Sequence, residues 1–413
     1  MDEQIKSRFD ILKDIMYQTG GAPEIPYDTV ITDLYNDMWY NKYFALTPET
    51  LNTQSDGTSA FTIKEAPINR PRHMEGRAQW TQAEGYDQKD GEMQFDSLGD
   101  FGSGFKITQK DLRYDEAVLK RYQDSDALYL MGKTMNTVAE HARGAFSTLS
   151  IMASEKMQYG KYLITGKRGL DVPSLQQLPS TAFRKVGTTA WSDPSALIIS
   201  DMIAIEEKFR EEVGNIDFNL SWKMSKKVIP LMLKNDEVKS QLSNLLTIDS
   251  GGNIQQVKQN LTKDILMRWF AANTSLISPI EFVDIKQEYI GDTQLVGQTL
   301  TETYDPIETW DASLVVLSYN GSQGNFYKGK SEELIGLPDT INVTPMLNGL
   351  INIRTQAKNE TYVPEMHTQL MMSAGAALTH WNQHWVMDIT STSTSEDLYA
   401  QRVPTFPQSI RIE

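Results

Sequence analysis

Hydrophobic residues between Leu128 and Met152 recur every three or four positions, the spacing that builds one face of an α-helix. The stripe consists of Leu128, Met131, Met135, Val138, Ala142, Ala145, Leu149 and Met152. Ser125 or Asp126 is a candidate N-cap, and Gly160 a candidate C-terminal stop. The pattern predicts a helix over about 125–159, a rod of roughly 45 Å at 1.5 Å per residue. Because only one narrow stripe is apolar, we expect one side to pack on a sheet and the other to face solvent or a neighbour.

The sequence before this helix predicts a short strand that glycines make more flexible. Phe101–Thr108 contains Gly102 and Gly104, and Thr108 begins a capping-box-like start of a short helix. Strand-like pieces at 60–66 and 104–108 flank the polar stretch 70–100. That stretch is either a mobile surface loop or a projecting β-hairpin arm that packs on a neighbouring subunit, and the flanking strands favour the arm.

The remaining pattern mixes helices and strands. Residues 1–18 have the spacing of a short amphipathic helix, and the aromatic-rich segment 27–53 is either a core segment or an extended arm across another subunit. Ser192 or Asp193 predicts a helix N-cap, with Pro194 in its first turn. Ser225 is a candidate N-cap for a helix over 227–245, and Pro230 is expected to bend or restart that helix. Strands are expected within 280–316 and 340–390, and the alternation over 381–389 is typical of a half-buried strand. The expected fold class is α+β, with two lobes that share strands from distant parts of the sequence.

Composition narrows the function classes. The 413-residue chain has a net charge of −15 and no cysteine, which excludes disulfides, thiolate metal sites and cysteine nucleophiles. An acidic chain without a basic patch is a poor candidate for tight binding of phosphate backbones. No apolar run is long enough to span a membrane and no signal peptide is apparent, so we expect synthesis and folding in the cytoplasm.

Motifs that indicate catalysis are weak. Gly132-Lys133-Thr134 imitates the end of a phosphate-binding loop, but it lies inside the predicted helix and Ala127 replaces the required glycine. His380 and His384 are four residues apart, yet their neighbours indicate a strand, which makes a metal pair a poor interpretation. His141 is expected at the surface. We therefore expect no catalytic, cofactor-binding or metal-binding residue. Acidic residues are plentiful, so the alternative function is an α+β enzyme or carbohydrate-binding module that uses a carboxylate pair in an inter-lobe cleft.

The order of these parts resembles one family. Three short features carry the likeness: the strand Gly104-Phe-Lys-Ile-Thr that leads to the long helix, the stretch from Met152 to Gly166 at its end, and Trp191-Ser-Asp-Pro-Ser-Ala at the start of the next predicted helix. The chain resembles the major capsid proteins of tailed bacteriophages with the Hong Kong 97-type fold, and the lambda-type branch most closely.

The resemblance implies a division of the chain. Residues 1–60 would be an N-terminal arm, 61–107 an extended hairpin called the E-loop, and 108–191 the first part of a peripheral (P) domain with its spine helix. Residues 192–339 would form the axial (A) domain. Residues 340–390 would return to complete the P-domain sheet, and 391–413 would be a C-terminal tail.

The resemblance also implies a function and partners. The chain would self-assemble into hexamers and pentamers of an icosahedral shell that encloses double-stranded DNA without specific nucleic-acid binding, in the virion, after assembly in the host cytoplasm. A separate scaffolding protein and a portal are implied partners, and a decoration protein is left open. Intersubunit contacts are inferred at Trp39, Tyr43, Arg70, Arg72, Arg77, Trp80 and Lys89. Gly102 and Gly104 are inferred as the hinge where the arm meets the spine helix.

Overall fold

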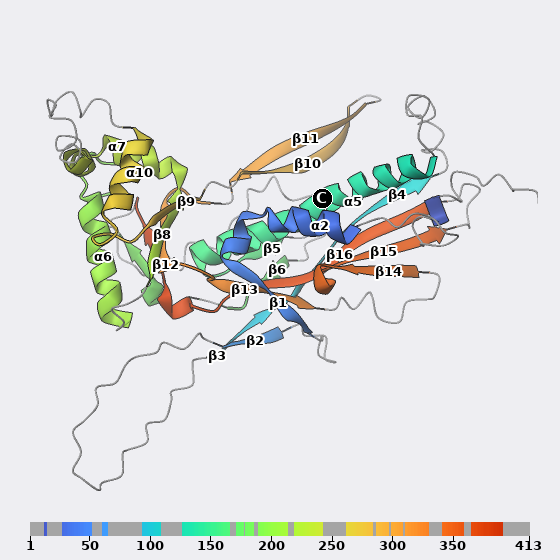
Figure 1. Cartoon of the computed structure of the whole chain (residues 1–413), viewed down its shortest axis with the longest axis horizontal. Coiled ribbons are helices and arrows are strands. Elements are labelled where there is room, and N and C mark those ends of the chain that lie inside the picture. Colours follow the sequence, from blue (N-terminus) through green and yellow to red (C-terminus); the bar gives the residue numbers. More distant parts are fainter. Residues whose placement is uncertain are drawn as a thin grey trace, which may run out of the picture. The chain divides into compact units, whose positions relative to one another are not determined.

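The structure is a computed structural model of the whole chain, and its described part divides into two compact units. Unit 1 comprises residues 1–61, 96–153 and 325–376, and unit 2 comprises 62–95, 154–324 and 377–413. The structure describes residues 12–14, 27–51, 60–64, 93–108, 126–165, 171–176, 178–185, 189–213, 219–242, 262–283, 286–296, 299–308, 310–329, 341–358 and 365–390. Helices and sheets coexist in both units, so the predicted α+β class is confirmed (Figure 1).

Unit 1 is built on a six-stranded sheet whose strands come from both ends of the chain. Its order is β1 (Phe44–Leu51), β13 (Gly324–Gly329), β16 (Glu365–Leu378), β15 (Ile351–Lys358) and β14 (Ile341–Met346), with β4 (Gly99–Thr108) also paired to β16. The pairing of β16 with β4 and β15 is antiparallel and continuous, from Glu365 opposite Thr108 to Ala374 opposite Gly99 on the β4 side. The late strands therefore complete a sheet with the strand that precedes the long helix, as predicted.

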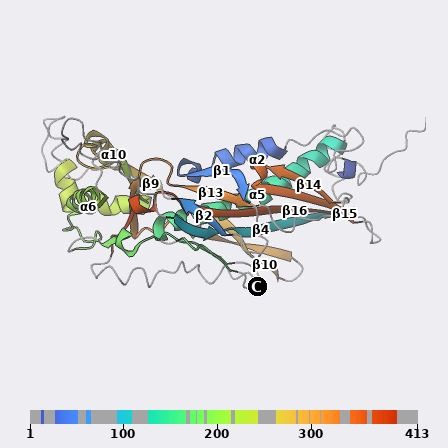
Figure 2. The ribbon, with the colours of Figure 1, turned by 90° about the horizontal axis from the view of Figure 1, so that it is seen from below.

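The long helix, α5, spans Asp126–Tyr159 and lies along this sheet in Figures 1 and 2. The His141 ring stacks on Phe105 of β4 with ring centroids 5.1 Å apart, and its Nδ1 lies 2.9 Å from Ser103 Oγ. His141 is thus half-buried at the surface, and the prediction of a surface histidine is confirmed only in part, because its ring packs on β4. The apolar stripe is buried at Val138, Ala142, Leu149 and Met152, but Phe146 takes the inward position predicted for Ala145.

The prediction of a single apolar stripe is wrong for the C-terminal end of α5. Every residue from Leu149 to Gln158 is buried, including the polar side chains of Ser150, Ser154, Glu155, Lys156 and Gln158. Buried polar groups are stable only with hydrogen-bond partners. These partners come from distant segments of the chain, which a helical periodicity does not reveal.

An aromatic cluster from the N-terminal segment fills the core of unit 1. Helix α2 (Tyr27–Asn36) and the short η1 (Trp39–Lys42) lead into β1. The Tyr40 and Phe44 rings lie 5.1 and 5.2 Å from Phe326, and Tyr35 lies 5.7 Å from Phe146. Tyr35, Tyr40, Tyr43 and Phe44 are all buried, which agrees with the core-segment interpretation of 27–51.

Unit 2 contains a five-stranded sheet covered by helices. Its order is β7 (Phe183–Lys185), β17 (His384–Asp388), β12 (Leu314–Tyr319), β8 (Leu220–Ser225) and β9 (Ile280–Val283). Strand β12 is antiparallel to both neighbours, whereas the outer strands β7 and β9 run parallel to theirs. The helices are α6 (Ile198–Val213), α7 (Ile229–Lys234) and α10 (Lys263–Ala272), with the short turns η3 (Ser180–Ala182), η4 (Lys226–Val228) and η7 (Trp381–Gln383). The alternation predicted over 381–389 was wrong, because every residue of β17 is buried.

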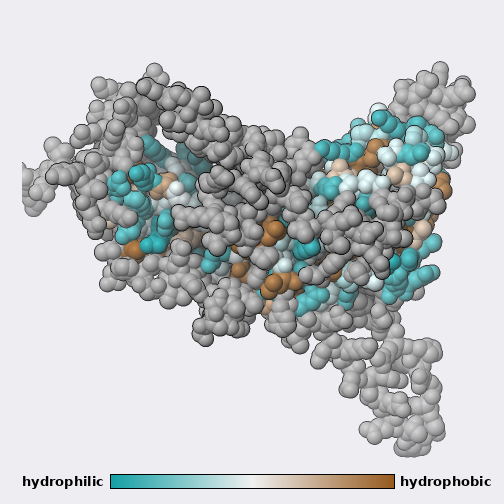
Figure 3. Space-filling model, turned by 180° about the vertical axis from the view of Figure 1, so that it is seen from behind, coloured by the Kyte–Doolittle hydropathy of each residue, from teal (hydrophilic) through white to brown (hydrophobic). Residues whose placement is uncertain are grey.

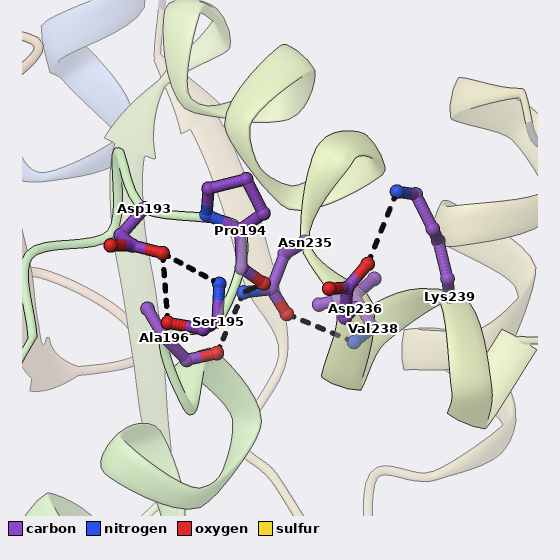
Figure 4. A network of polar contacts seen from close by, with 8 residues as sticks. All are labelled: Asp193, Pro194, Ser195, Ala196, Asn235, Asp236, Val238 and Lys239. Carbon is purple, nitrogen blue, oxygen red and sulfur yellow. Dashed lines mark hydrogen bonds and ion pairs between the residues drawn. The ribbon is translucent and has the colours of Figure 1, made fainter.

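Helix α6 begins later than predicted, at Ile198. The Asp193 carboxylate accepts hydrogen bonds from the Ser195 amide and hydroxyl, both at 2.8 Å, and so closes a local turn instead of capping the helix (Figure 4). The amides of Ile199 and Ser200 donate instead to the Glu237 carboxylate, at 2.8 and 3.2 Å. The cap therefore comes from a distant residue.

The predicted helix through 227–245 is interrupted at Asn235, not at Pro230. Pro230 lies in the first turn of α7, where its missing N–H costs nothing. The Asn235 side chain donates to the carbonyls of Pro194 and Ala196 at 3.1 and 2.6 Å and accepts from the Val238 amide at 3.0 Å (Figure 4). Its oxygen caps the helical residues 236–242, so a new helix starts there.

Three two-stranded ribbons complete the described elements: β2 (Ala60–Lys64) with β3 (Met93–Ser97), β5 (Leu163–Thr165) with β6 (Asp171–Pro173), and β10 (Lys286–Val296) with β11 (Thr299–Glu308). The strand predicted at 104–108 is confirmed as part of β4, but the strand that pairs with β2 is β3. Residues 65–92, 109–125 and 391–413 and most of 1–26 lie outside the described residues.

Candidate functional site

Two predicted contact residues, Trp39 and Tyr43, lie in unit 1. The Trp39 indole is half-buried and donates to Ser150 Oγ at 2.7 Å, and the Tyr43 side chain is buried beside it, with ring centroids 5.9 Å apart. Both rings thus contribute to the packing of their own chain, and their contact with another subunit stays a prediction. Arg70, Arg72, Arg77, Trp80 and Lys89 lie outside the described residues.

The predicted hinge glycines lie inside strand β4. Gly102 is opposite Met371 and Gly104 opposite Gln369 in an uninterrupted ladder with β16, and neither has a positive φ. A Cβ on Gly104 would lie 3.1 Å from Gln369 Cγ and 3.3 Å from the Thr368 carbonyl oxygen, whereas a Cβ on Gly102 would meet only the Leu370 carbonyl oxygen, at 3.6 Å. Close packing accounts for glycine at 104 but not at 102. The hinge stays a prediction, and bending there would have to deform β16 as well.

The end of α5 is anchored by polar contacts within unit 2. The Asp311 amide donates to Gln158 Oε1 at 2.6 Å, and the Leu163 amide donates to Glu155 Oε2 at 3.2 Å. Lys156 Nζ donates to Ser174 Oγ, and Nε2 of His384 donates to the Met157 carbonyl at 2.6 Å. Gly160 ends the helix with φ +70°, as its position predicted. These contacts connect the end of α5 to four residues elsewhere in the unit.

Burial perturbs the two titratable groups at this helix end in opposite directions. Burial raises the pKa of Glu155 to about 8, and the Leu163 amide opposes the rise only in part. Burial lowers the pKa of His384 to about 4, helped by the nearby Lys223 charge. Because Nε2 of His384 donates to a carbonyl, its Nδ1 is the unprotonated acceptor, and it has no partner in the described structure. At neutral pH both groups are mainly uncharged.

Two buried lysines were not singled out by the sequence. Lys223 Nζ donates to the hydroxyls of Ser221 and Ser318 at 2.7 and 2.8 Å. Lys328 Nζ donates to the Asn348 carbonyl at 2.7 Å, and so supports a turn in which Leu347 and Asn348 both have positive φ. Lys223 alternates with buried Trp222 and Met224, so a period of two predicts an outward side chain, whereas Lys328 lies on the same strand face as buried Phe326. Only the backbone and hydroxyl partners make their burial possible.

The described residues contain no cluster of three or more potential metal ligands. Gly132-Lys133-Thr134 lies within α5, which agrees with its rejection as a phosphate loop. His384 is in β17 and His380 precedes η7, so the two do not share a helix face. In the same described part, no helix is long and apolar enough to cross a membrane. Large apolar side chains that are exposed there are isolated, at Leu175, Leu197 and Leu276, and Figure 3 shows hydrophobic and hydrophilic residues interspersed.

Comparison with known proteins gives structural neighbours only. No protein-family model matches the chain, and a search of curated proteins returned no match. Among solved structures, a proposed prophage capsid protein of E. coli CFT073 is similar over 92% of this chain and 97% of its own, at 11% identity and a TM-score of 0.44. The satellite phage P4 procapsid that includes the Sid protein is similar over 95% of this chain and 98% of its own, at 10% identity and a TM-score of 0.41. The mature capsid of bacteriophage PhiM1 is similar over 85% of this chain and 88% of its own, at 11% identity and a TM-score of 0.38. Because every one of these TM-scores is below 0.5, the functional conclusion rests on the features of the chain itself.

Proposed function

We propose that this chain is the major capsid protein of a tailed bacteriophage with a Hong Kong 97-type fold. One observation carries the proposal: β4 is paired along its length with β16, a strand more than 250 residues later, and α5 lies on the same sheet. The resemblance implies that strands from residues 340–390 complete the sheet on which the long helix packs. That arrangement is specific, because sheets are usually assembled from strands that are near neighbours in sequence.

Further features support a shell subunit. The net charge of −15 opposes binding of a phosphate backbone, which suits a protein wall that encloses double-stranded DNA without holding it. The buried carboxyl groups of Glu155 and Glu206 each accept hydrogen bonds from their own chain, Glu206 from the Trp222 indole at 2.6 Å and the Ser278 amide at 2.8 Å. These two acids are therefore committed to the fold and do not favour the carboxylate-enzyme alternative.

The finer assignment follows from the resemblance. The chain forms hexamers and pentamers of an icosahedral shell in the virion, assembles in the host cytoplasm, and works with a scaffolding protein and a portal; its role is structural and not enzymatic. Residues 1–60 are the N-terminal arm, 61–107 the E-loop and 192–339 the A domain. The P domain consists of 108–191 and 340–390. Within the E-loop segment, the β2–β3 ladder is its described base.

The direct test is the state of the purified full-length chain. We expect light scattering and electron microscopy to show capsomers or closed shells, with the yield raised by co-expression of a scaffolding protein. A chain that stays strictly monomeric at high concentration, with and without that protein, would overturn the proposal.

A deletion separates assembly from folding. Replacing residues 70–88 by a short Gly-Ser linker keeps β2 and β3 intact, so we expect a monomer with unchanged circular dichroism that no longer forms shells. If the monomer itself unfolds, the segment belongs to the core of the subunit and is not an intersubunit arm.

A further inference from the structure

Strand β4 forms an edge of the unit 1 sheet. It pairs with β16 on one side, and among the described strands none pairs with its other side. Natural edge strands are usually short, or are blocked by proline, a bulge or a covering element. β4 has ten residues, no proline and no register shift. The other end strands are β14, which has six residues including Pro345 and has α2 packed against it, and β1, which has eight residues including Pro48. Among the described end strands, β4 is therefore the longest and the one without a proline, which makes it the edge best able to accept a further strand.

The sequence of β4 is symmetric about Ser103. It runs Asp100-Phe-Gly-Ser-Gly-Phe-Lys106, with glycine and then phenylalanine on either side of the serine. When two identical strands pair antiparallel around a twofold axis at Ser103, Gly102 lies opposite Gly104 and Phe101 opposite Phe105. Asp100 of each strand then lies opposite Lys106 of the other. The two ends of the motif have opposite charges, so the twofold pairing forms two favourable ion pairs.

The side chains of β4 are placed to allow this pairing. Ser103 and Phe105 contact His141 of α5, so odd-numbered residues are on the helix side of the sheet and Asp100 and Lys106 are together on the opposite side. Asp100, Ser103 and Lys106 are exposed. Lys106 Nζ lies 3.8 Å from Glu365 Oε1, a long and partly solvated contact that leaves the ammonium group able to pair elsewhere.

The same register explains a glycine that the subunit alone does not require. Nothing closer than 3.6 Å would contact a Cβ on Gly102. In the twofold pairing, glycines occupy the central positions on the face that also holds the charged residues. The space between the two ion pairs is then free of side chains, and both pairs can close.

We propose that β4 pairs with β4 of a second copy of this chain, antiparallel and centred on Ser103, and joins two six-stranded sheets into one. A closed twofold contact of this kind is isologous, so one strand supplies both halves of the interface. In a shell it would be a contact across a local twofold axis, but the pairing itself does not depend on shell formation.

Disulfide trapping tests the register, because the chain has no cysteine of its own. Directly opposed residues of an antiparallel pair have Cα atoms roughly 4.5–5.5 Å apart, within the range of a disulfide. We expect the full-length Ser103→Cys variant to form a cross-linked dimer under mild oxidation. The matched control is Asn136→Cys, on the exposed face of α5, which should cross-link at least tenfold more slowly. Equal rates for the two variants, or no dimer from Ser103→Cys, would overturn the proposal.

Charge reversal in the Ser103→Cys background tests the pairing chemistry. Asp100→Lys or Lys106→Asp alone places like charges opposite each other at both ends, and we expect the cross-linking rate to fall roughly tenfold. The double variant Asp100→Lys with Lys106→Asp restores both ion pairs and should recover most of the rate. A double variant as slow as the single ones would refute the twofold register. Cross-linking without shells would refute the capsid proposal alone, and shells without cross-linking would refute this contact alone.

Discussion

Glu155 and His384 predict a pH profile of stability in which two buried groups oppose each other. The His384 pKa falls from 6.5 in the unfolded chain to about 4 in the folded one. Below pH 6.5 His384 is protonated in the unfolded state but stays neutral in the folded state. The free energy of unfolding therefore falls progressively as the pH falls to about 4. At 1.36 kcal/mol per unit, the loss amounts to roughly 3 kcal/mol.

Glu155 acts with the opposite sign. Its pKa rises from 4.5 in the unfolded chain to about 8 in the folded one. Above pH 4.5 the unfolded state releases a proton that the folded state keeps, so stability falls as the pH rises toward 8, by roughly 5 kcal/mol in total. Between pH 4.5 and 6.5 the two slopes are equal and opposite. We therefore expect these groups to give a flat profile in that window, and a fall of roughly 2 kcal/mol from pH 6.5 to 8.

Two isosteric variants separate the contributions. His384→Gln keeps an N–H that can reach the Met157 carbonyl but does not titrate, so its stability should rise as the pH falls from 8 to 4.5. Glu155→Gln keeps the acceptor for the Leu163 amide, so its stability should fall from pH 6.5 to 4 and change little between 6.5 and 8.

Urea unfolding followed by tryptophan fluorescence provides the assay, because most of the indoles report on unit 2. Six of the eight tryptophans are described residues of that unit: Trp191, Trp222, Trp269, Trp310, Trp381 and Trp385. Parallel profiles for the wild-type chain and both variants would refute the reasoning, because they would show that neither group changes its pKa on folding.

Three further substitutions test local anchors, each by urea unfolding at pH 7. Gly160→Ala should destabilise unit 2 by about 2 kcal/mol or more, because φ is +70° and the new Cβ would overlap the Leu178 side chain. Its control, Gly144→Ala in the same helix, meets nothing within 4 Å and should stabilise by up to ~1 kcal/mol; the same sign for both would contradict the account. Glu237→Ala should cost about 1 kcal/mol through loss of the α6 cap, whereas exposed Glu211→Ala should be nearly neutral. Asn235→Ala should cost roughly 2–3 kcal/mol, because it leaves the Pro194 and Ala196 carbonyls and the Val238 amide without their partner; a loss below about 0.5 kcal/mol would show that water replaces it.

Periodicity was enough to predict α5 and the late strands, because both depend on which face of an element is apolar. It failed where polar residues are buried. Lys156 and Gln158 look solvent-facing in the sequence, and they are buried because Ser174 and Asp311 supply hydrogen bonds from other segments. No pattern within the helix contains that information.

Helix ends show the same limit. The Ser-Asp-Pro signal at 192–194 is a valid local cap, yet the Asp193 carboxylate closes a turn and Glu237, 38 residues away, binds the free amides of α6. Pro230 is a valid break signal too, but it is harmless in a first turn, and the bonds of Asn235 decide where the helix stops. A local rule states what a residue is able to do, and the tertiary partners select among the options.

The interpretation of β4 changes for a related reason. Glycines in an isolated strand indicate looseness, which led to the hinge prediction for Gly102 and Gly104. In the described structure, pairing with β16 along ten residues and contact with α5 through His141 hold β4 as a fixed edge, and the hinge stays an untested prediction. A fixed edge presents its backbone groups in one geometry, so binding of a partner strand carries no entropy cost for ordering β4. The symmetric motif then has a physical use: in a rigid strand, only one antiparallel register places both charge pairs, both glycine pairs and both phenylalanine pairs opposite each other.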